Sequence, residues 1–374
     1  MKIIYFVTSV TARSHSLNDI LDVNRLPRSV TNSEQTQVSK QGSRSARPVF
    51  VMGCHRSGTN LLYDNLLSAG GFAIYRGYLP IYKMLIPRFG DLSDAANRKQ
   101  MVDTWLRSKG FRRSGLDPAD HGQKLMDSCR TGGDFMRLTM DDVAKKQGAQ
   151  RWAVYDPDNV LYVSKIKRDI PDALFVHIIR DGRDIALSLK KMGGFAPLPW
   201  DRSQTRSLLA TAMYWEWMVR KGREYGTEIP EDYFEVRYED LVNKPKETLS
   251  SLGRFLDHEL DYERIRTASL GRLRETNSSF REEASQEKVK PVNRWKERLS
   301  AEDIVALEAA IGSYLAELGY PLTTAEEDRA RVSSSRVMRS VYPMFLNTKL
   351  WLKTETPVGR MANLSALELE GATQ

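Results

Sequence analysis

The amino-acid sequence predicts an α/β fold, in which helices flank both faces of a parallel sheet and a helical extension follows at the C-terminus. Two stretches of the chain share one order of apolar strand, polar turn and helix, and three weaker strand patterns lie beside further helical stretches. Strands that alternate with helices are typical of parallel sheets. The 374 residues, 41% of them hydrophobic, are enough for one large domain.

The first strand–turn–helix unit begins at Pro48. Residues 49–52 form a continuous apolar run, which is typical of a strand buried on both faces. The chain then passes through a glycine loop, residues 53–59, into a segment with helical spacing over residues 60–67. The sequence therefore predicts a buried strand, a glycine loop and a helix.

The second unit repeats this order. It has an apolar strand at residues 173–179, a polar turn at 180–184 and a helix at 185–189. Weaker patterns predict the remaining elements, with strands at residues 72–75, 152–155 and 233–236 and helices at 208–223 and 246–256. Five strands interleaved with helices are therefore expected.

The formal net charge of +8 is concentrated near the N-terminus, where residues 1–47 hold seven basic and three acidic side chains. Residues 29–47 have almost no apolar side chain and cannot offset the entropy of ordering. We therefore expect residues 1–47 to be a disordered arm, 48–324 the folded domain and 325–374 a helical extension or tail. Because the domain is nearly balanced in charge, we expect no nucleic-acid partner.

Two cysteines, Cys54 and Cys129, form no disulfide framework and lack metal-ligand spacing, so we expect no metal site. No apolar run approaches the roughly 18 residues of a transmembrane helix, and we expect a cytoplasmic protein. Residues 331–353 mix apolar and basic side chains. They fit a membrane surface, a subunit contact or packing against the same chain, and Pro343 is expected to interrupt any single helix there.

The glycine loop has the GxxxxG spacing of a P-loop between Gly53 and Gly58, so the sheet is P-loop-like. A nucleotide triphosphatase places Lys and then Ser or Thr after the second glycine, where this chain has Thr59 and Asn60. The cation lies instead inside the loop, at Arg56. This pattern predicts a phosphate-like ligand without the usual magnesium arrangement, although a plain tight turn has the same spacing.

A second candidate anion site lies where the second strand ends. Arg180 ends that strand, and Ser188 lies two turns into the following helix. An arginine binds phosphate through two hydrogen bonds, and a hydroxyl donates one more. The alternative is that Arg180 pairs with Asp181 or Asp184 and Ser188 has no ligand.

These residues resemble the sulfotransferase superfamily, which uses 3′-phosphoadenosine 5′-phosphosulfate (PAPS), and in particular the Arg-loop branch of tyrosylprotein and bacterial-type sulfotransferases. Residues 56–59 are similar to the family's 5′-phosphosulfate loop, and Arg180 with Ser188 to its 3′-phosphate site. Residues 236–241 are similar to a strand-end segment of the family, and residues 290–295 to the stretch that closes over the nucleotide. The resemblance covers residues 48–321.

The resemblance implies a PAPS-dependent transferase without a metal. Its nucleotide-binding residues would be Arg56, Ser57, Gly58, Thr59, Asn60, Arg180, Ser188, Tyr238, Ser285 and Arg294. Arg56 would also be catalytic, because it stabilises charge on the bridging oxygen. The acceptor stays open among small molecules, carbohydrates, lipids and peptides.

Two positions depart from the tyrosylprotein branch: Tyr155 replaces a lysine before Asp156-Pro157, and Gly77 lies where a catalytic glutamate is usual. The base is therefore unassigned. Asp156 is the first candidate, although it could equally cap the next helix. His121 is interpreted as a surface residue, Asp134 as a helix cap, and His55 as a loop residue that could touch the sulfuryl group.

Three functions remain open at this point. The first is a PAPS-dependent sulfotransferase acting on a hydroxyl or amine. The second is a P-loop kinase or nucleotidase, with Asp181 as a metal-binding acid. The third is a nucleotide-binding scaffold that has lost its chemistry. An aromatic-rich segment, residues 213–217, could line an acceptor cleft but is more typical of a core helix.

Overall fold

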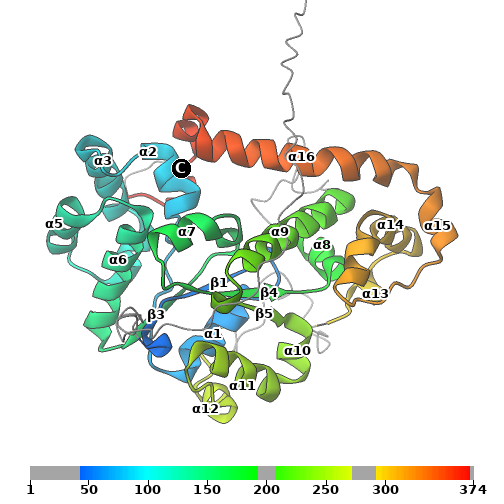
Figure 1. Ribbon diagram of the computed structural model, residues 1–374, viewed down its shortest axis with the longest axis horizontal. Helices are drawn as coiled ribbons and strands as arrows, with labels where there is room; N and C mark the ends of the chain where they lie inside the picture. The colour runs from blue at the N-terminus through cyan, green and yellow to red at the C-terminus, as the bar shows by residue number, and fades with distance from the viewer. Residues whose placement is uncertain (1–42, 193–206, 272–291, 371–374) are drawn as a thin grey trace, which may run out of the picture. The chain divides into compact units, whose positions relative to one another are not determined.

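The computed structural model describes residues 43–192, 207–271 and 292–370. Its centre is a five-stranded parallel sheet in the order β2-β3-β1-β4-β5 (Figure 1). The strands are β1 (Val49–Met52), β2 (Phe72–Ala73), β3 (Arg151–Tyr155), β4 (Leu174–Ile179) and β5 (Tyr233–Arg237). The predicted α/β fold with a parallel sheet is confirmed.

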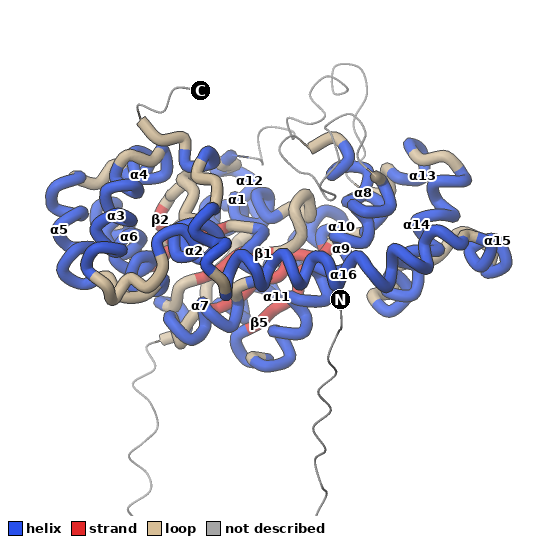
Figure 2. The backbone as a smooth tube through the Cα atoms, turned by 90° about the horizontal axis from the view of Figure 1, so that it is seen from above, coloured by secondary structure: helices blue, strands red, loops and turns tan. Residues whose placement is uncertain are grey.

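Helices surround this sheet in Figure 2. Their bounds are α1 (Thr59–Ala69), α2 (Ile86–Phe89), α3 (Ala95–Leu106), α4 (Lys109–Ser114), α5 (Pro118–Ser128), α6 (Gly132–Gln147), α7 (Val163–Asp169), α8 (Gly182–Lys190), α9 (Leu208–Glu228), α10 (Tyr238–Asn243), α11 (Pro245–Leu256), α12 (Tyr262–Ala268), α13 (Trp295–Arg298), α14 (Ala301–Glu317), α15 (Glu326–Arg331) and α16 (Ser333–Glu355). The sequence missed most of those between β2 and β3.

Strand β1 is central because it pairs on both sides, through Val49 with Ala153 of β3 and with Leu174 of β4. All four of its residues are buried. Successive side chains of a strand point to opposite faces, so Val49 and Val51 join one hydrophobic cluster and Phe50 and Met52 join the other. A continuous apolar run is therefore what this position requires.

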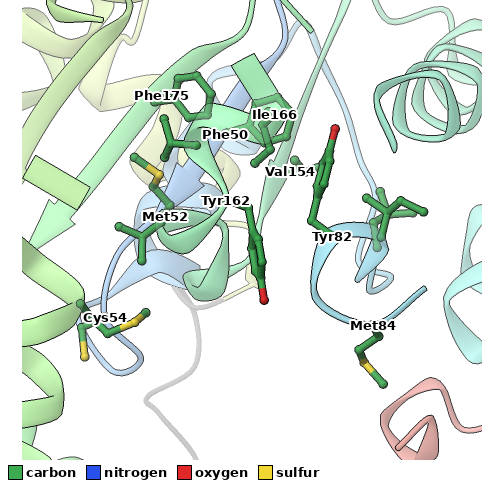
Figure 3. Packing of buried hydrophobic residues seen from close by; sticks show 14 of the residues in the cluster. Phe50, Met52, Cys54, Tyr82, Met84, Val154, Tyr162, Ile166 and Phe175 are labelled. Atoms are coloured by element: carbon green, nitrogen blue, oxygen red, sulfur yellow. The ribbon is translucent and has the colours of Figure 1, made fainter. Parts of the chain in front are cut away.

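The two clusters cover the two faces of the sheet. On one face α1 and α11 contribute leucines, Leu62 and Leu252 among them. On the other face Phe50 stacks on Phe175 with ring centroids 5.5 Å apart, and Figure 3 shows both among the buried residues of this cluster. The aromatic segment of α9 belongs here too, since Trp215 is fully buried. The segment therefore belongs to the hydrophobic core, as its aromatic-rich sequence indicated.

Helix α16 runs unbroken from Ser333 to Glu355 with Pro343 inside it, so the expected interruption is wrong. Proline removes one backbone hydrogen bond. The flanking side chains compensate, because Tyr342 and Leu346 are both buried against the core. Tertiary packing therefore outweighs the local cost of the proline.

The proposed N-terminal arm falls mostly on residues 1–42, outside the described part of the chain. Its last residues pack on the fold. The Arg44 guanidinium lies 4.5 Å from the ring centroid of Phe255, and Arg47 pairs with Asp232 at 3.2 Å. Among the described helices, none is both long and apolar enough to cross a membrane.

Candidate active site

The loop between β1 and α1 has a backbone that its glycines make possible. Gly58 has a φ of 102°, and a Cβ there would lie 2.5 Å from Cδ2 of Tyr238. Arg56 also has a positive φ, 73°. A left-handed arginine is uncommon, because its Cβ crowds the backbone. The loop thus holds Arg56 in an unfavourable conformation, which is often a property of functional sites.

The N-terminus of α1 follows this loop directly. Its first intrahelical hydrogen bond runs from the Leu62 amide to the Gly58 carbonyl at 3.0 Å. The amides of Thr59 and Asn60 precede that bond and belong to the open end of the helix, which attracts anions. The buried Ser57 hydroxyl has no hydrogen-bond partner among the described residues. Both features fit an anionic ligand at this loop.

The second candidate anion site lies against the first. The Arg56 Nε donates to Ser188 Oγ at 2.9 Å, and Arg180 donates to the Arg56 carbonyl at 3.4 Å. The Arg180 guanidinium also lies 4.2 Å from the ring centroid of Tyr238. Four of the predicted nucleotide residues, Arg56, Arg180, Ser188 and Tyr238, therefore meet at the carboxyl ends of β1, β4 and β5.

Asp184 joins the segment at α13 to this cluster. One oxygen of its carboxylate pairs with Arg180 at 3.2 Å, and the other accepts the Trp295 amide at 2.9 Å. Arg294 is the residue before Trp295, and its charge acts on Tyr238. The structure therefore brings Arg294 to the same place, whereas Ser285 lies outside the described residues.

Asp181 has a structural role in the described fold. It caps α8 by accepting the Arg183 amide at 2.9 Å, and it pairs with the Arg183 guanidinium at 2.8 Å. Arg183 in turn pairs with the buried Glu308 at 2.6 Å. These contacts occupy the carboxylate that the kinase hypothesis needs as a metal ligand.

A cluster of ionisable side chains lies beside the loop, at the end of β3. Asp158 pairs with His55 at 3.2 Å and with Lys83 of the helical turn η2 (Ile81–Leu85). Asp156 accepts the Asp158 amide at 3.0 Å and so caps η3 (Pro157–Leu161). Both carboxylates are buried. Asp156 therefore does cap the turn, and it also lies in a charged group next to Arg56.

The surroundings shift the pKa values of Asp156 and Asp158 in opposite directions. Burial and the neighbouring charge of Asp158 raise the pKa of Asp156 from 3.8 to about 6. Burial acts in the same direction on Asp158, but His55 and Lys83 outweigh it and hold the pKa of Asp158 well below its ordinary value. Two carboxyl groups with separated pKa values are typical of acid–base sites.

The sequence interpretation missed Lys83 and Asp158. Two signals were present. Lys83 is the only charged residue in the apolar stretch from Leu79 to Pro87, and Asp158 follows Asp156 two residues later. A lone lysine in an apolar run needs a buried partner, which Asp158 provides.

A small pocket of about 10 Å³ opens on Asp156. Gly77 and Tyr155, the two positions that depart from the tyrosylprotein pattern, both line it, as do Tyr75 and Asn159. The pocket therefore places both departures next to the candidate base.

The other two base candidates lie elsewhere. His121 was expected at the surface, but it is buried between α5 and α6, where Nδ1 lies 2.9 Å from Asp142 Oδ2. That expectation is wrong because α5 packs the face that carries His121 against α6. Asp134 completes a capping box with Thr131 at the start of α6, as its position suggested.

Comparisons with known proteins identify the family of this chain. The model of the sulfotransferase family matches residues 48–262. A provisionally named protein-tyrosine sulfotransferase of Caenorhabditis briggsae is 23% identical over 291 residues, covering 75% of this chain and 91% of that protein. A protein of the same provisional name from Caenorhabditis elegans is 24% identical over 231 residues, which cover 60% of this chain and 84% of that protein.

Among solved structures, the sulfotransferase domain from the curacin biosynthetic pathway is similar to this chain with a TM-score of 0.47 and 16% identity, covering 74% of this chain and 98% of that one. The family match spans more than half of the 374 residues and includes the loop at Arg56 and the pair Arg180 and Ser188. This protein therefore belongs to the sulfotransferase family, whose reaction is the transfer of a sulfuryl group.

Proposed function

We propose that the protein transfers a sulfuryl group from PAPS to a hydroxyl or amine acceptor by in-line displacement. The observation that carries the proposal is the meeting of Arg56, Arg180 and Ser188 at the N-terminus of α1. PAPS has anionic groups at its 5′ and 3′ positions, and two adjacent arginine sites match that pair.

Each of these residues has a separate task. Arg56 and the amides of residues 57–60 hold the 5′-phosphosulfate, where Arg56 stabilises the charge that develops on the bridging oxygen. Arg180 and Ser188 hold the 3′-phosphate. Tyr238, Arg294 and Ser285 complete the nucleotide site. Fixed arginine and amide donors supply this stabilisation at the loop itself.

Asp156 accepts the acceptor's proton in this proposal. As the acceptor oxygen or nitrogen forms its bond to sulfur, the bond from sulfur to the 5′-phosphate oxygen breaks, and the proton passes to the Asp156 carboxylate. A base acts best when its pKa is near the working pH, and that of Asp156 is about 6. Asp158, held by His55 and Lys83, positions this carboxylate through its amide.

Calorimetric titration tests the nucleotide site. We expect the product 3′,5′-bisphosphate to bind at least about ten-fold more tightly than ADP, because only the former offers a phosphate to the Arg180 site. Equal binding of the two, or no binding of either, would contradict the proposed function. Incubation of an extract with PAPS labelled in the sulfate, followed by fractionation, then identifies the acceptor.

Replacing Arg180 with alanine is expected to weaken bisphosphate binding by about 100-fold, since a charge-assisted pair to phosphate is lost. The same substitution should weaken the binding of an analogue that lacks the 3′-phosphate by less than about three-fold. Titration of both ligands with both proteins gives the comparison. Equal losses would show that Arg180 does not bind the 3′-phosphate.

The raised pKa of Asp156 also predicts a stability difference. Its folded-state pKa, about 6, exceeds its ordinary value of 3.8. Between these two values the folded state binds more protons, so stability is lost as the pH rises through this window. The free energy of unfolding of the wild type should therefore fall by about 2 kcal/mol between pH 4 and pH 6, relative to that of the Asp156→Asn variant.

Urea unfolding of both proteins across this range measures the difference. Asp158, Lys83, His55 and Tyr78 act electrostatically in this cluster. They are present in the variant as well, so the difference between the two curves reports the titration of Asp156 together with its coupling to His55 and Asp158. Parallel curves for the two proteins would refute the assignment of the raised pKa.

A further inference from the structure

The exposed apolar side chains of the described residues are gathered in one place. Seven large hydrophobic residues are exposed, and six of them lie between residues 341 and 361: Val341, Met344, Trp351, Leu352, Val358 and Met361. Trp351 is 55% exposed and Met361 80%. Such a concentration is unusual on a soluble surface and marks an interaction site.

These residues form an outer face of α16 and of the turn that follows it, η7 (Pro357–Met361). Tyr342 and Leu346, one turn apart, point inward and are buried. Val341, Met344 and Trp351 are three and seven residues apart, the spacing of a single helical face. Figure 1 shows α16 as one long helix, and it packs against α9 and α14. The helix is therefore apolar on two sides, and only one of them is covered within the described chain.

The charge of this segment is positive. Residues 333–361 contain five basic residues and one acidic residue, Glu355, which already pairs with Lys165 at 2.6 Å. Within the described residues no carboxylate pairs with the exposed Lys349 or Arg360. Their long side chains can reach past the apolar face toward an anionic surface.

We propose that the outer face of α16 and η7 binds the surface of an anionic lipid bilayer. Exposed Trp, Leu and Met beside Lys and Arg are the composition of a helix that lies in the membrane interface. Charge favours this occupant over a second copy of the chain. A symmetric dimer would bring the same cations together, whereas anionic headgroups neutralise them.

The location of α16 gives the contact a use. Lys353, near the end of the helix, interacts electrostatically with Lys83, Asp158 and Asp156. Membrane binding therefore brings the side of the protein that carries α16 to the bilayer, which favours a hydroxyl carried by a lipid as the acceptor. This choice of acceptor rests on the proposed function, whereas the lipid contact itself needs no nucleotide.

Flotation with vesicles tests the contact, using the full chain without nucleotide. We expect binding to vesicles of phosphatidylcholine with phosphatidylglycerol and at least about ten-fold weaker binding to phosphatidylcholine alone. The double variant Met344→Ser, Trp351→Ser should bind the mixed vesicles at least about ten-fold more weakly. Lys349→Gln should lose about five-fold.

Matched controls test whether vesicle binding depends on this face or on any exposed apolar or basic side chain. Ile74 is the seventh exposed hydrophobic residue, at 47%, and Lys99 is an exposed lysine on α3. Ile74→Ser and Lys99→Gln should leave vesicle binding unchanged. Failure of the wild type to bind mixed vesicles would overturn the proposal, as would equal losses in the controls. A dimer that the double variant dissociates in light scattering, with vesicle binding unaltered, would assign the face to a second copy. Bisphosphate titration is unaffected by any of these outcomes, so the proposed function is judged separately.

Discussion

Replacing Arg56 with alanine is expected to lower the rate of sulfuryl transfer by about 10²–10³-fold, the loss that follows removal of one donor to a developing oxyanion. Arg56 lies inside the glycine loop and donates to Ser188 at 2.9 Å. The variant therefore loses both the charge at the reacting centre and a link to the second anion site. The rate at which label moves from PAPS to the acceptor fraction measures the effect.

Two companion variants make this result specific. Arg107→Ala removes an exposed arginine at the end of α3 and should leave the rate unchanged. Arg56→Lys keeps a positive charge but not the planar guanidinium, and should recover only part of the activity. If Arg56→Ala reduces bisphosphate affinity but not the rate at saturating PAPS, then Arg56 binds the nucleotide without assisting the reaction.

Replacing Asp158 with alanine is expected to reduce the free energy of unfolding by about 2–3 kcal/mol at pH 7, because it leaves the partly buried Lys83 ammonium and the His55 imidazole without their partner. His55 and Lys83 both pair with this carboxylate, whose side chain is 8% exposed. The pKa of Asp158 is lowered in the folded state, so its stabilisation is present in full at neutral pH and is lost only in acid.

An exposed pair on α3 provides the control. Asp103 pairs with Lys99 at 2.7 Å, and both side chains are more than half exposed. Asp103→Ala should cost less than about 1 kcal/mol. Urea unfolding of the three proteins gives the comparison. A similar small loss in both variants would show that the cluster at Asp158 is well solvated, and the acid–base argument for Asp156 would lose its basis.

The strands and the loops at their carboxyl ends were predictable because their signals are local. Residues 49–52 match β1, and the strand predicted at 173–179 differs from β4 by one residue. Such a strand buries both faces, so every residue must be apolar and the pattern is unambiguous. Arg56, Arg180 and Ser188 were likewise recognisable from their distance to a strand end. Parallel strands align their carboxyl ends, which brings these residues together.

The candidate base site was harder to predict because its members come from three separate parts of the chain. His55, Lys83 and Asp158 belong to the glycine loop, η2 and η3, and no short motif connects them. Only the pairing of β1 with β3 brings the loop to Asp158. Pro343 failed as a helix breaker for a similar reason, since local propensity does not include the burial of Tyr342 and Leu346.

The position of β1 in the sheet has a consequence for synthesis of the protein. Val49 leaves the ribosome before both of its partners, Ala153 and Leu174, which follow more than a hundred residues later. At about 5–20 residues per second, the central strand waits on the order of ten seconds for its neighbours. During that time an apolar segment with two unpaired edges is exposed to aggregation. The strand that precedes the glycine loop is thus a part of the nascent chain that a chaperone would protect during this interval.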